Sequence, residues 1–130
     1  METDYAARAR ALVGTRFRLQ GRGAEGLDCI GVVLATFGLP TECVRRNYSF
    51  KGNHDAEARR CIALHFRGVS RNQMRPGDLL LVKVATDQLH LAIRTVAGVV
   101  HAHAGIGRVV ETPGLPDGEL VGAYRKRRSR

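Results

Sequence analysis

Residues 26–38 read GLDCIGVVLATFG and predict a helix that begins beside a cysteine. Asp28 is suited to cap this helix, because its carboxylate can accept a hydrogen bond from a free N–H group of the first turn. Gly38, followed two residues later by Pro40, predicts where the helix ends. The apolar residues between these two signals fall at helical spacing and predict one buried face: Ile30, Val33, Leu34 and Phe37.

Two further helices are expected in the first half of the chain. Residues 4–13 predict a short helix that stops at Gly14, and residues 19–27 form a glycine-rich loop. A third helix is expected at residues 55–66. Its inner stripe combines four residues at helical spacing: Ala58, Cys61, Ile62 and His65.

The pattern changes after the turn sequence RPGD at residues 75–78. The segments beyond it are short and either alternating or rich in β-branched residues, and Gly, Asp or Pro separates them, as in hairpins. Five strands are expected, at residues 79–84, 88–96, 99–103, 108–111 and 120–125. Helices followed by strands predict an α+β fold with a mainly antiparallel sheet.

The composition is that of a folded, globular protein. The chain has 130 residues, of which 44% are hydrophobic and 25% are charged, so it has enough apolar surface to bury a core. We expect one domain at residues 1–124. No apolar run is long enough to cross a membrane, and the start of the chain lacks the apolar segment of a secretory signal. Synthesis in the cytoplasm without a signal peptide is therefore expected.

Basic residues outnumber acidic ones by 21 to 12, which gives a formal net charge of +9. Five of them lie in residues 125–130, which we expect to form a basic C-terminal tail. Such a charge favours polyanions: nucleic acid, a cell-wall polymer or an acidic partner surface. Trp is absent and aromatic residues make up only 5% of the chain, so platforms on which bases could stack are scarce. We therefore expect no nucleic-acid partner.

The chain has three cysteines, Cys29, Cys43 and Cys61, none of them in a CxxC pair. This odd number argues against a disulfide framework and favours a reducing site of synthesis. His54 and His65 flank Cys61, but their spacing matches no zinc pattern, so no metal is expected. We interpret Cys43, Cys61, His54 and His65 as structural residues.

Cys29 is the candidate nucleophile. It follows the glycine-rich loop and lies in the first turn of the predicted helix. The partial positive charge and the free N–H groups of a helix N-terminus stabilise a thiolate, and they can also hold the oxyanion of an acyl-transfer intermediate. Asp28 has two interpretations at this stage: capping alone, or capping together with the binding of a substrate amine beside Cys29.

Three histidines on two predicted strands supply a candidate base. Side chains alternate along a strand, so His90 points away from its apolar neighbours, and His101 and His103 share one face of the following strand. If these strands pair, His90 and His101 lie on the same surface. A nucleophile, a base and an orienting group are the three parts of a catalytic triad.

Five blocks of sequence, in this order, resemble the NlpC-type cysteine peptidases, which are papain-like cell-wall hydrolases. The resemblance spans roughly residues 5–125 and is greatest to short single-domain members encoded among phage-tail and gene-transfer-agent genes. The blocks are ALVGTRFR at residues 11–18, GLDCIGVV at 26–33, RPGDLLL at 75–81, LHLAI at 89–93 and VHAHAG at 100–105.

The resemblance implies a papain-like NlpC fold, with N-terminal helices on a sheet of five to six strands. It implies that Cys29 is the nucleophile, that His90 is the base and that His101 orients His90, with His103 as the alternative third residue. Phe17 stands where family members often have a tyrosine, so this substrate-binding position lacks a hydroxyl group. No metal or organic cofactor is implied.

The expected function is hydrolysis of amide bonds in the peptide stems of peptidoglycan. The resemblance implies the bond between D-γ-glutamate and diaminopimelate. We expect a phage-like tail particle to carry the protein to the periplasm, with tail-hub proteins as partners. The alternative is a structural tail-tip or adaptor protein that keeps the peptidase fold without relying on hydrolysis.

Overall fold

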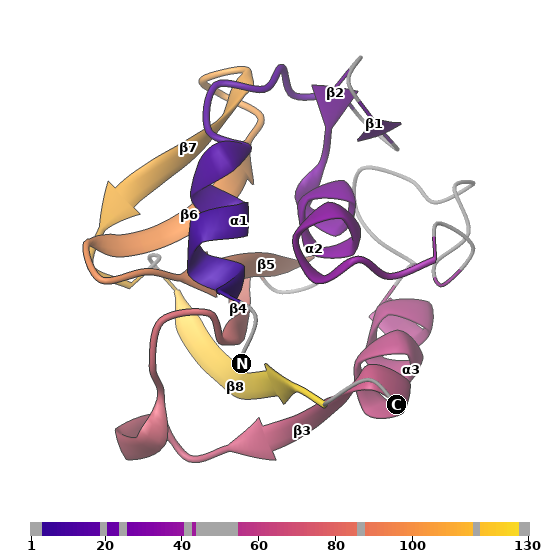
Figure 1. The fold of residues 1–130 in the computed structure, drawn as a ribbon, viewed down its shortest axis with the longest axis vertical. Coiled ribbons are helices and arrows are strands. Elements are labelled where there is room, and N and C mark those ends of the chain that lie inside the picture. Colours follow the sequence, from indigo (N-terminus) through magenta and orange to yellow (C-terminus); the bar gives the residue numbers. More distant parts are fainter. Residues whose placement is uncertain are drawn as a thin grey trace.

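The computed structural model describes residues 4–18, 21–23, 26–40, 43, 55–85, 88–115 and 118–127. Within these ranges the chain forms three α-helices (Figure 1): α1 (Tyr5–Ala11), α2 (Cys29–Phe37) and α3 (Asp55–His65). The three expected helices are thus confirmed, although α1 is shorter than predicted. None of the described helices has the length and apolarity needed to span a membrane.

The strands form two sheets. The small sheet pairs β1 (Arg22–Gly23) with β2 (Gly26–Leu27). The large sheet has the order β3-β8-β4-β5-β6-β7, and all its neighbouring strands are antiparallel. Its strands are β3 (Phe66–Val69), β4 (Leu79–Ala85), β5 (Gln88–Arg94), β6 (Gly98–His103), β7 (Arg108–Pro113) and β8 (Glu119–Lys126). The expected α+β fold with a sheet of five to six strands is confirmed.

One strand of the large sheet, β3, was not predicted. Phe66 begins this strand instead of ending α3, which corrects the predicted helix boundary. The strand has four residues, includes Gly68 and buries fully only Phe66, so it lacks the alternation by which a strand is identified. Its partners are at the end of β8, where Arg125 and Lys126 pair with Arg67 and Phe66. Two residues of the expected basic tail therefore belong to the sheet.

Asp78 of the RPGD turn holds Arg125 in place. The guanidinium donates from Nε to Oδ1 and from Nη2 to Oδ2, both at 2.8 Å, and the Asp78 side chain is only 2% exposed. Oδ2 of Asp78 also accepts a hydrogen bond from the backbone N–H of Arg75, and Nη2 of Arg125 donates to the carbonyl of Gln73. Two parallel hydrogen bonds of this kind fix the orientation of the guanidinium group and strengthen its attraction to the carboxylate. The charge of Arg125 is therefore engaged inside the fold.

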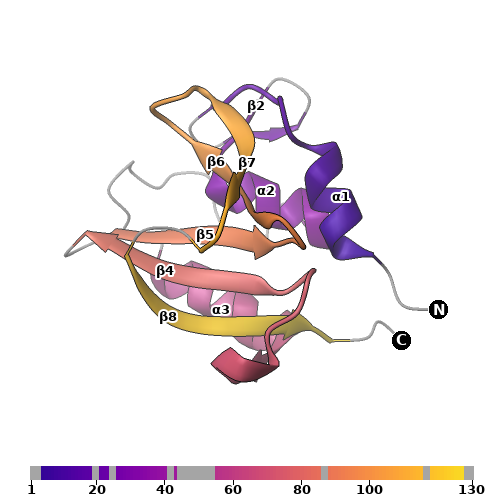
Figure 2. The same cartoon turned by 90° about the vertical axis from the view of Figure 1, so that its left-hand side faces the viewer.

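Apolar side chains are buried on both faces of the large sheet. Figure 2 shows α1 and α2 on the same side of β5. The face that packs with α2 carries Leu79, Leu81, Leu91 and Ile93, and the opposite face carries Leu80, Val82, Ala92, Val99 and Ala123. The predicted apolar face of α2 is confirmed, because its four members are all buried: Ile30, Val33, Leu34 and Phe37.

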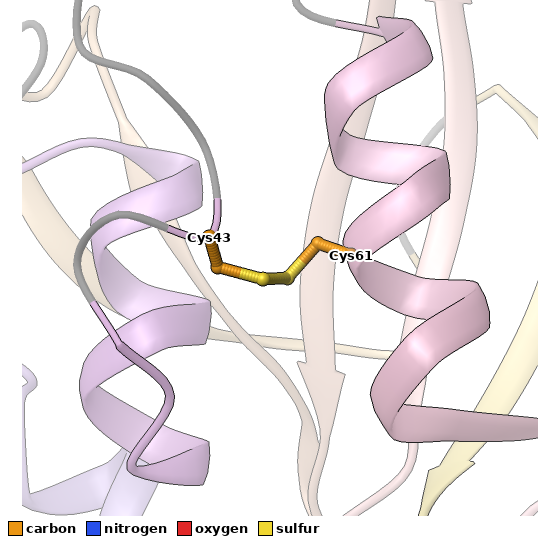
Figure 3. The surroundings of a disulfide bond; sticks show 2 residues. All are labelled: Cys43 and Cys61. Atoms are coloured by element: carbon orange, nitrogen blue, oxygen red, sulfur yellow. A yellow bond between two sulfur atoms is a disulfide. The ribbon is translucent and has the colours of Figure 1, made fainter.

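Cys43 and Cys61 form a disulfide bond (Figure 3) that links the segment after α2 to α3. The expectation of two unpaired structural cysteines is therefore wrong. The two residues are 18 positions apart and meet only because α3 packs its inner face, including Cys61, against the core, which spacing alone does not reveal. The odd cysteine count has a simple explanation, since Cys29 is not disulfide-bonded. His54 lies outside the described residues.

Close backbone packing fixes the start of α2. A Cβ atom added at Gly31 would overlap the carbonyl oxygen of Gly21, and one added at Gly21 would overlap the carbonyl oxygen of Gly26. Glycine is therefore required at positions 21 and 31, where the segment at Gly21 passes close to the first turn of α2. Because Cys29 lies in the same turn, these glycines also determine where its thiol lies.

We expect Gly31→Ala to lower the free energy of unfolding by about 1–3 kcal/mol, because the new methyl group displaces backbone atoms. Gly68→Ala is the matched control, since nothing lies within 4 Å of an added Cβ there, and we expect it to leave stability unchanged or slightly raised. Urea denaturation of the two variants measures the difference. Equal stability of both variants would show that the contact with Gly21 does not constrain the helix.

Candidate active site

Two of the three candidate histidines are in direct contact. Nε2 of His90 on β5 and Nδ1 of His101 on β6 lie 2.8 Å apart and share a hydrogen bond. Their rings meet edge to face, with centroids 5.0 Å apart and an interplanar angle of 80°. Among the described residues, β5 and β6 pair at the other end of β5, where Ile93 and Arg94 lie opposite Val100 and Val99. The prediction that these strands bring His90 and His101 to one surface is confirmed.

The other ring nitrogen of His101 also has a partner. Nε2 lies 3.2 Å from the Oγ1 atom of Thr112 on β7. The sequence did not single out Thr112, because the predicted strand ended one residue too early, at position 111. The available signal was the period of two along β7, which places Val110 and Thr112 on the same face.

His103 has a different role in the fold. Its Nδ1 atom accepts a hydrogen bond from the backbone N–H of Ile106, at 3.0 Å, in the turn between β6 and β7. Its ring centroid lies 5.9 Å from that of His101. His103 therefore lies beside the pair, and the hydrogen bond with His90 is made by His101. Which of the two histidines is the third catalytic residue stays a prediction.

Cys29 is the first residue of α2, is partly buried and is not part of a disulfide bond. Asp28 caps the helix as predicted, since its Oδ1 atom accepts a hydrogen bond from the N–H of Gly31 at 2.8 Å. The helix packs against β5 and β6, the strands that carry His90 and His101. Elements far apart in the sequence thus bring together the helix of the candidate nucleophile and the strands of the candidate base.

The segment around Phe17 connects the two halves of the site. Two isolated β-bridges, which are backbone pairings, lie in this segment. Arg16 pairs with Arg108, which lies opposite His103 in the register of β6 and β7. Phe17 pairs with Leu27, two residues before Cys29. The N–H of Phe17 donates to the carbonyl of Gly107 at 2.8 Å. Phe17 is partly buried against the main core. Phe17 therefore lies between the start of α2 and the turn after β6, and its role in substrate binding stays a prediction.

A sequence model of the NlpC/P60 family matches residues 14–113, a span that contains Phe17, Cys29, His90 and His101. The chain belongs to the NlpC/P60 family. No curated protein sequence matches the chain.

Solved structures share the fold of this NlpC/P60 domain. The peptidoglycan hydrolase RipB from Mycobacterium tuberculosis is 22% identical, with a TM-score of 0.58 over 94% of this chain. The P60 domain of an antigen from M. avium subspecies paratuberculosis is 21% identical, with a TM-score of 0.60. It matches 94% of this chain and 91% of its own. The chain spans 62% of the length of the RipB chain that it matches.

The histidine pair of this NlpC/P60 domain is electrostatically unusual. Burial, with smaller contributions from His101 and His103, lowers the pKa of His90 from 6.5 to about 4. Burial, followed by the charge on His103, also lowers the pKa of His101. Both rings are therefore neutral near pH 7. A neutral imidazole has one donor and one acceptor nitrogen. Each ring can therefore accept a hydrogen bond on one side and donate one on the other, so that hydrogen bonds can continue through both rings.

One group of residues in the described part of the chain is compact enough to share a metal ion. The ligand atoms of Cys43, Cys61 and His65 all lie within 4.8 Å of one another. The two sulfur atoms are bonded to each other, so in this form they offer no thiolate ligands. The expectation that the domain needs no metal stays a prediction.

The pKa of His90 predicts how stability depends on pH. Between pH 6.5 and about 4 the unfolded chain binds a proton at His90 that the folded chain does not, so stability falls as the pH is lowered through this window. Above pH 6.5 the contribution is constant. The lowered pKa of His90 corresponds to a decrease of up to about 3 kcal/mol in the free energy of unfolding as the pH falls from 6.5 to about 4.

We expect His90→Gln to flatten the stability profile between pH 6.5 and 4, because glutamine does not titrate. Urea denaturation of the wild type and the variant at several pH values measures the two slopes. NMR titration of the His90 ring gives its pKa directly. Identical slopes, or a ring that titrates near pH 6.5, would contradict the assigned environment.

Proposed function

We propose that this chain is a cysteine peptidase that hydrolyses amide bonds in the peptide stems of peptidoglycan, of the D-γ-glutamyl-diaminopimelate type. The observation that carries the proposal is the hydrogen bond between His90 and His101. It is found in an NlpC/P60 domain in which Cys29, the cysteine outside the disulfide, begins a helix. RipB, which shares the fold, is a peptidoglycan hydrolase, and this supports the substrate class.

In the proposed reaction, the sulfur of Cys29 attacks the carbonyl carbon of the scissile amide. The position at the start of α2 supports this role, because the free N–H groups and the positive end of the helix dipole stabilise the thiolate. The same N–H groups can donate hydrogen bonds to the oxyanion of the tetrahedral intermediate. Asp28 holds this helix start in place through its bond to Gly31.

His90 acts as the general base and then as the general acid. Its neutral ring takes the proton of the Cys29 thiol as the C–S bond forms, and it delivers that proton to the leaving amine as the C–N bond breaks. Nε2 of His90 faces His101, so Nδ1 is the nitrogen assigned to this transfer. His101 accepts the Nε2–H group and keeps the ring in the productive tautomer.

Hydrolysis of the thioester completes the cycle. Water attacks the acyl carbon, His90 removes a proton from this water, and the C–S bond breaks to release the acid product and regenerate Cys29. The reaction consumes one water molecule for each amide bond and requires no metal or organic cofactor.

The residues around the site suit an acidic peptide. Arg16 and Arg108 are exposed, and their backbones form a β-bridge close to Phe17 and to the turn after β6. Peptidoglycan stems carry carboxylates, with which guanidinium groups pair well. We assign Phe17 an apolar contact with the stem, and we assign His103, which is partly exposed, to the rim of the substrate site. A substrate amine could reach Asp28 only beside the capping bond, because Asp28 is just 3% exposed.

We further propose that the domain acts in the periplasm after delivery by a phage-like tail or gene-transfer agent, with tail-hub proteins as partners. The disulfide between Cys43 and Cys61 supports action in an oxidising compartment. The alternative, a structural tail-tip protein, explains neither a cysteine kept outside the disulfide at the start of α2 nor the bonded histidine pair. Copurification with tail proteins tests the delivery route.

We expect Cys29→Ala and His90→Ala each to lower the release of stem-peptide fragments from purified sacculi by about 10³-fold or more, because each removes a reacting group. His101→Ala is expected to lower it by roughly 10²-fold, because His90 loses its orienting partner. The measurement is chromatography of soluble fragments over time.

The control for these variants is Thr36→Val, on the same helix as Cys29 but at its other end. Its hydroxyl is among the buried polar atoms of the described residues that have no partner, so the change is expected to preserve activity. Fragment release by Cys29→Ala at the wild-type rate would exclude the peptidase mechanism and favour the structural alternative.

The disulfide also predicts how the protein responds to reductants. A loop of this size contributes about 3 kcal/mol to stability, so dithiothreitol is expected to lower the free energy of unfolding by about that amount. The double variant Cys43→Ala/Cys61→Ala should be insensitive to the reductant. Quantification of thiols in the protein purified from periplasm completes the test, and three free thiols there would contradict the proposed compartment.

A further inference from the structure

We infer that Thr112 is a positioning residue for the histidine pair, because its hydroxyl accepts the Nε2–H group of His101 and thereby fixes the tautomer that His101 presents to His90. The inference rests on the proposed roles of Cys29 and His90. It adds Thr112 to the contact between His90 and His101, on the side of His101 away from His90.

The tautomers along this chain are linked. For His90 to take a proton at Nδ1, its Nε2 atom must carry hydrogen and donate to Nδ1 of His101, 2.8 Å away. His101 must then hold its own hydrogen on Nε2, since a neutral imidazole carries only one. That nitrogen lies 3.2 Å from Oγ1 of Thr112, so the hydroxyl oxygen is the acceptor.

The backbone holds Thr112 where this contact is made. Thr112 lies opposite Val99 in the register of β6 and β7, and Pro113 lies opposite Gly98. A Cβ atom added at Gly98 would overlap the carbonyl oxygen of Thr112, so glycine allows the two strands to approach closely. The position of the Thr112 hydroxyl is therefore set mainly by a single side-chain rotation.

Glu111, the residue before Thr112, is held by hydrogen bonds on the face of the sheet opposite to Thr112. The carboxylate of Glu111 accepts a hydrogen bond from the hydroxyl of Thr95 at 2.6 Å and pairs with Nε of Arg10 at 3.2 Å. Oγ1 of Thr95 in turn accepts the N–H of Gly98 at 3.0 Å. These contacts restrain β7 beside Thr112, so Thr112 can restrain His101.

His103 does not replace Thr112 in this role. Its Nδ1 atom is occupied by the N–H of Ile106, and its ring contacts that of His101 at a centroid distance of 5.9 Å. Among the described residues, Thr112 is the hydrogen-bond partner of Nε2 of His101. His101 itself is only 9% exposed, so loss of this acceptor leaves a largely buried N–H group without its bond.

The test compares Thr112→Val, which keeps the shape and removes the hydroxyl, with Thr112→Ser, which keeps the hydroxyl. We expect Thr112→Val to lower kcat for a soluble stem peptide about tenfold with KM unchanged, because a hydrogen bond of this kind contributes about one factor of ten. Thr112→Ser is expected to stay within about twofold of the wild type. Thr36→Val is the control for loss of a threonine hydroxyl elsewhere.

Nitrogen-15 NMR of the histidine rings reads the tautomer directly, without substrate. We expect His101 to be the Nε2–H tautomer in the wild type and in Thr112→Ser, and a mixture of tautomers in Thr112→Val. An Nδ1–H tautomer of His101 in the wild type would overturn the inference, and that result requires no variant to fold. An unchanged tautomer and an unchanged kcat in Thr112→Val would overturn it as well.

The two readouts separate this inference from the proposed function. If Cys29→Ala retains activity while Thr112→Val changes the tautomer of His101, the proposed peptidase fails and the positioning contact stands. If Cys29→Ala is inactive while the tautomer does not respond to Thr112, the peptidase stands and the positioning role fails.

Discussion

The alternation of side chains along β5, β6 and β7 is the constraint on which the rest of the structure depends. One set of positions, including Leu91 and Ile93, packs on α2 and forms the main core. The intervening positions carry His90, His101 and Thr112, whose polar atoms bond to one another. A shift of register by one residue would exchange the two sets, so the pairing that builds the core also assembles the histidine pair and its threonine partner.

Two kinds of buried hydrogen bond hold the parts of the molecule in position. The N-cap of α2 and the glycines that cross it define where Cys29 lies. The pair between Asp78 and Arg125 ties the turn before β4 to the end of β8. Removal of one member of such a buried pair leaves an uncompensated charge. Burial also lowers the pKa of His90, which keeps the ring neutral near pH 7, so that one ring nitrogen is a hydrogen-bond acceptor.

Much of this arrangement could be predicted from the sequence, because the features concerned are local. The cap at Asp28, the stripe from Ile30 to Phe37 and the period of two around His90 each depend on neighbouring residues. The features that were missed depend on distant ones. Cys43 and Cys61 meet through packing of α3, and β3 forms only against the end of β8. Thr112 gains its importance from His101 on another strand, so its own surroundings in the sequence give little sign of it.

The pairing of Arg125 with Asp78 changes how the end of the chain can be treated. Residues 125–127 resemble a disposable charged extension, yet Arg125 neutralises a buried carboxylate, and Nε of Arg127 donates to the carbonyl of Phe66. Trimming the chain before residue 125 would strip the sheet of a counter-ion and would leave β3 with fewer partners. Fusions and affinity tags therefore belong after Arg127, and a shortened version made to reduce charge would lose part of the architecture with it.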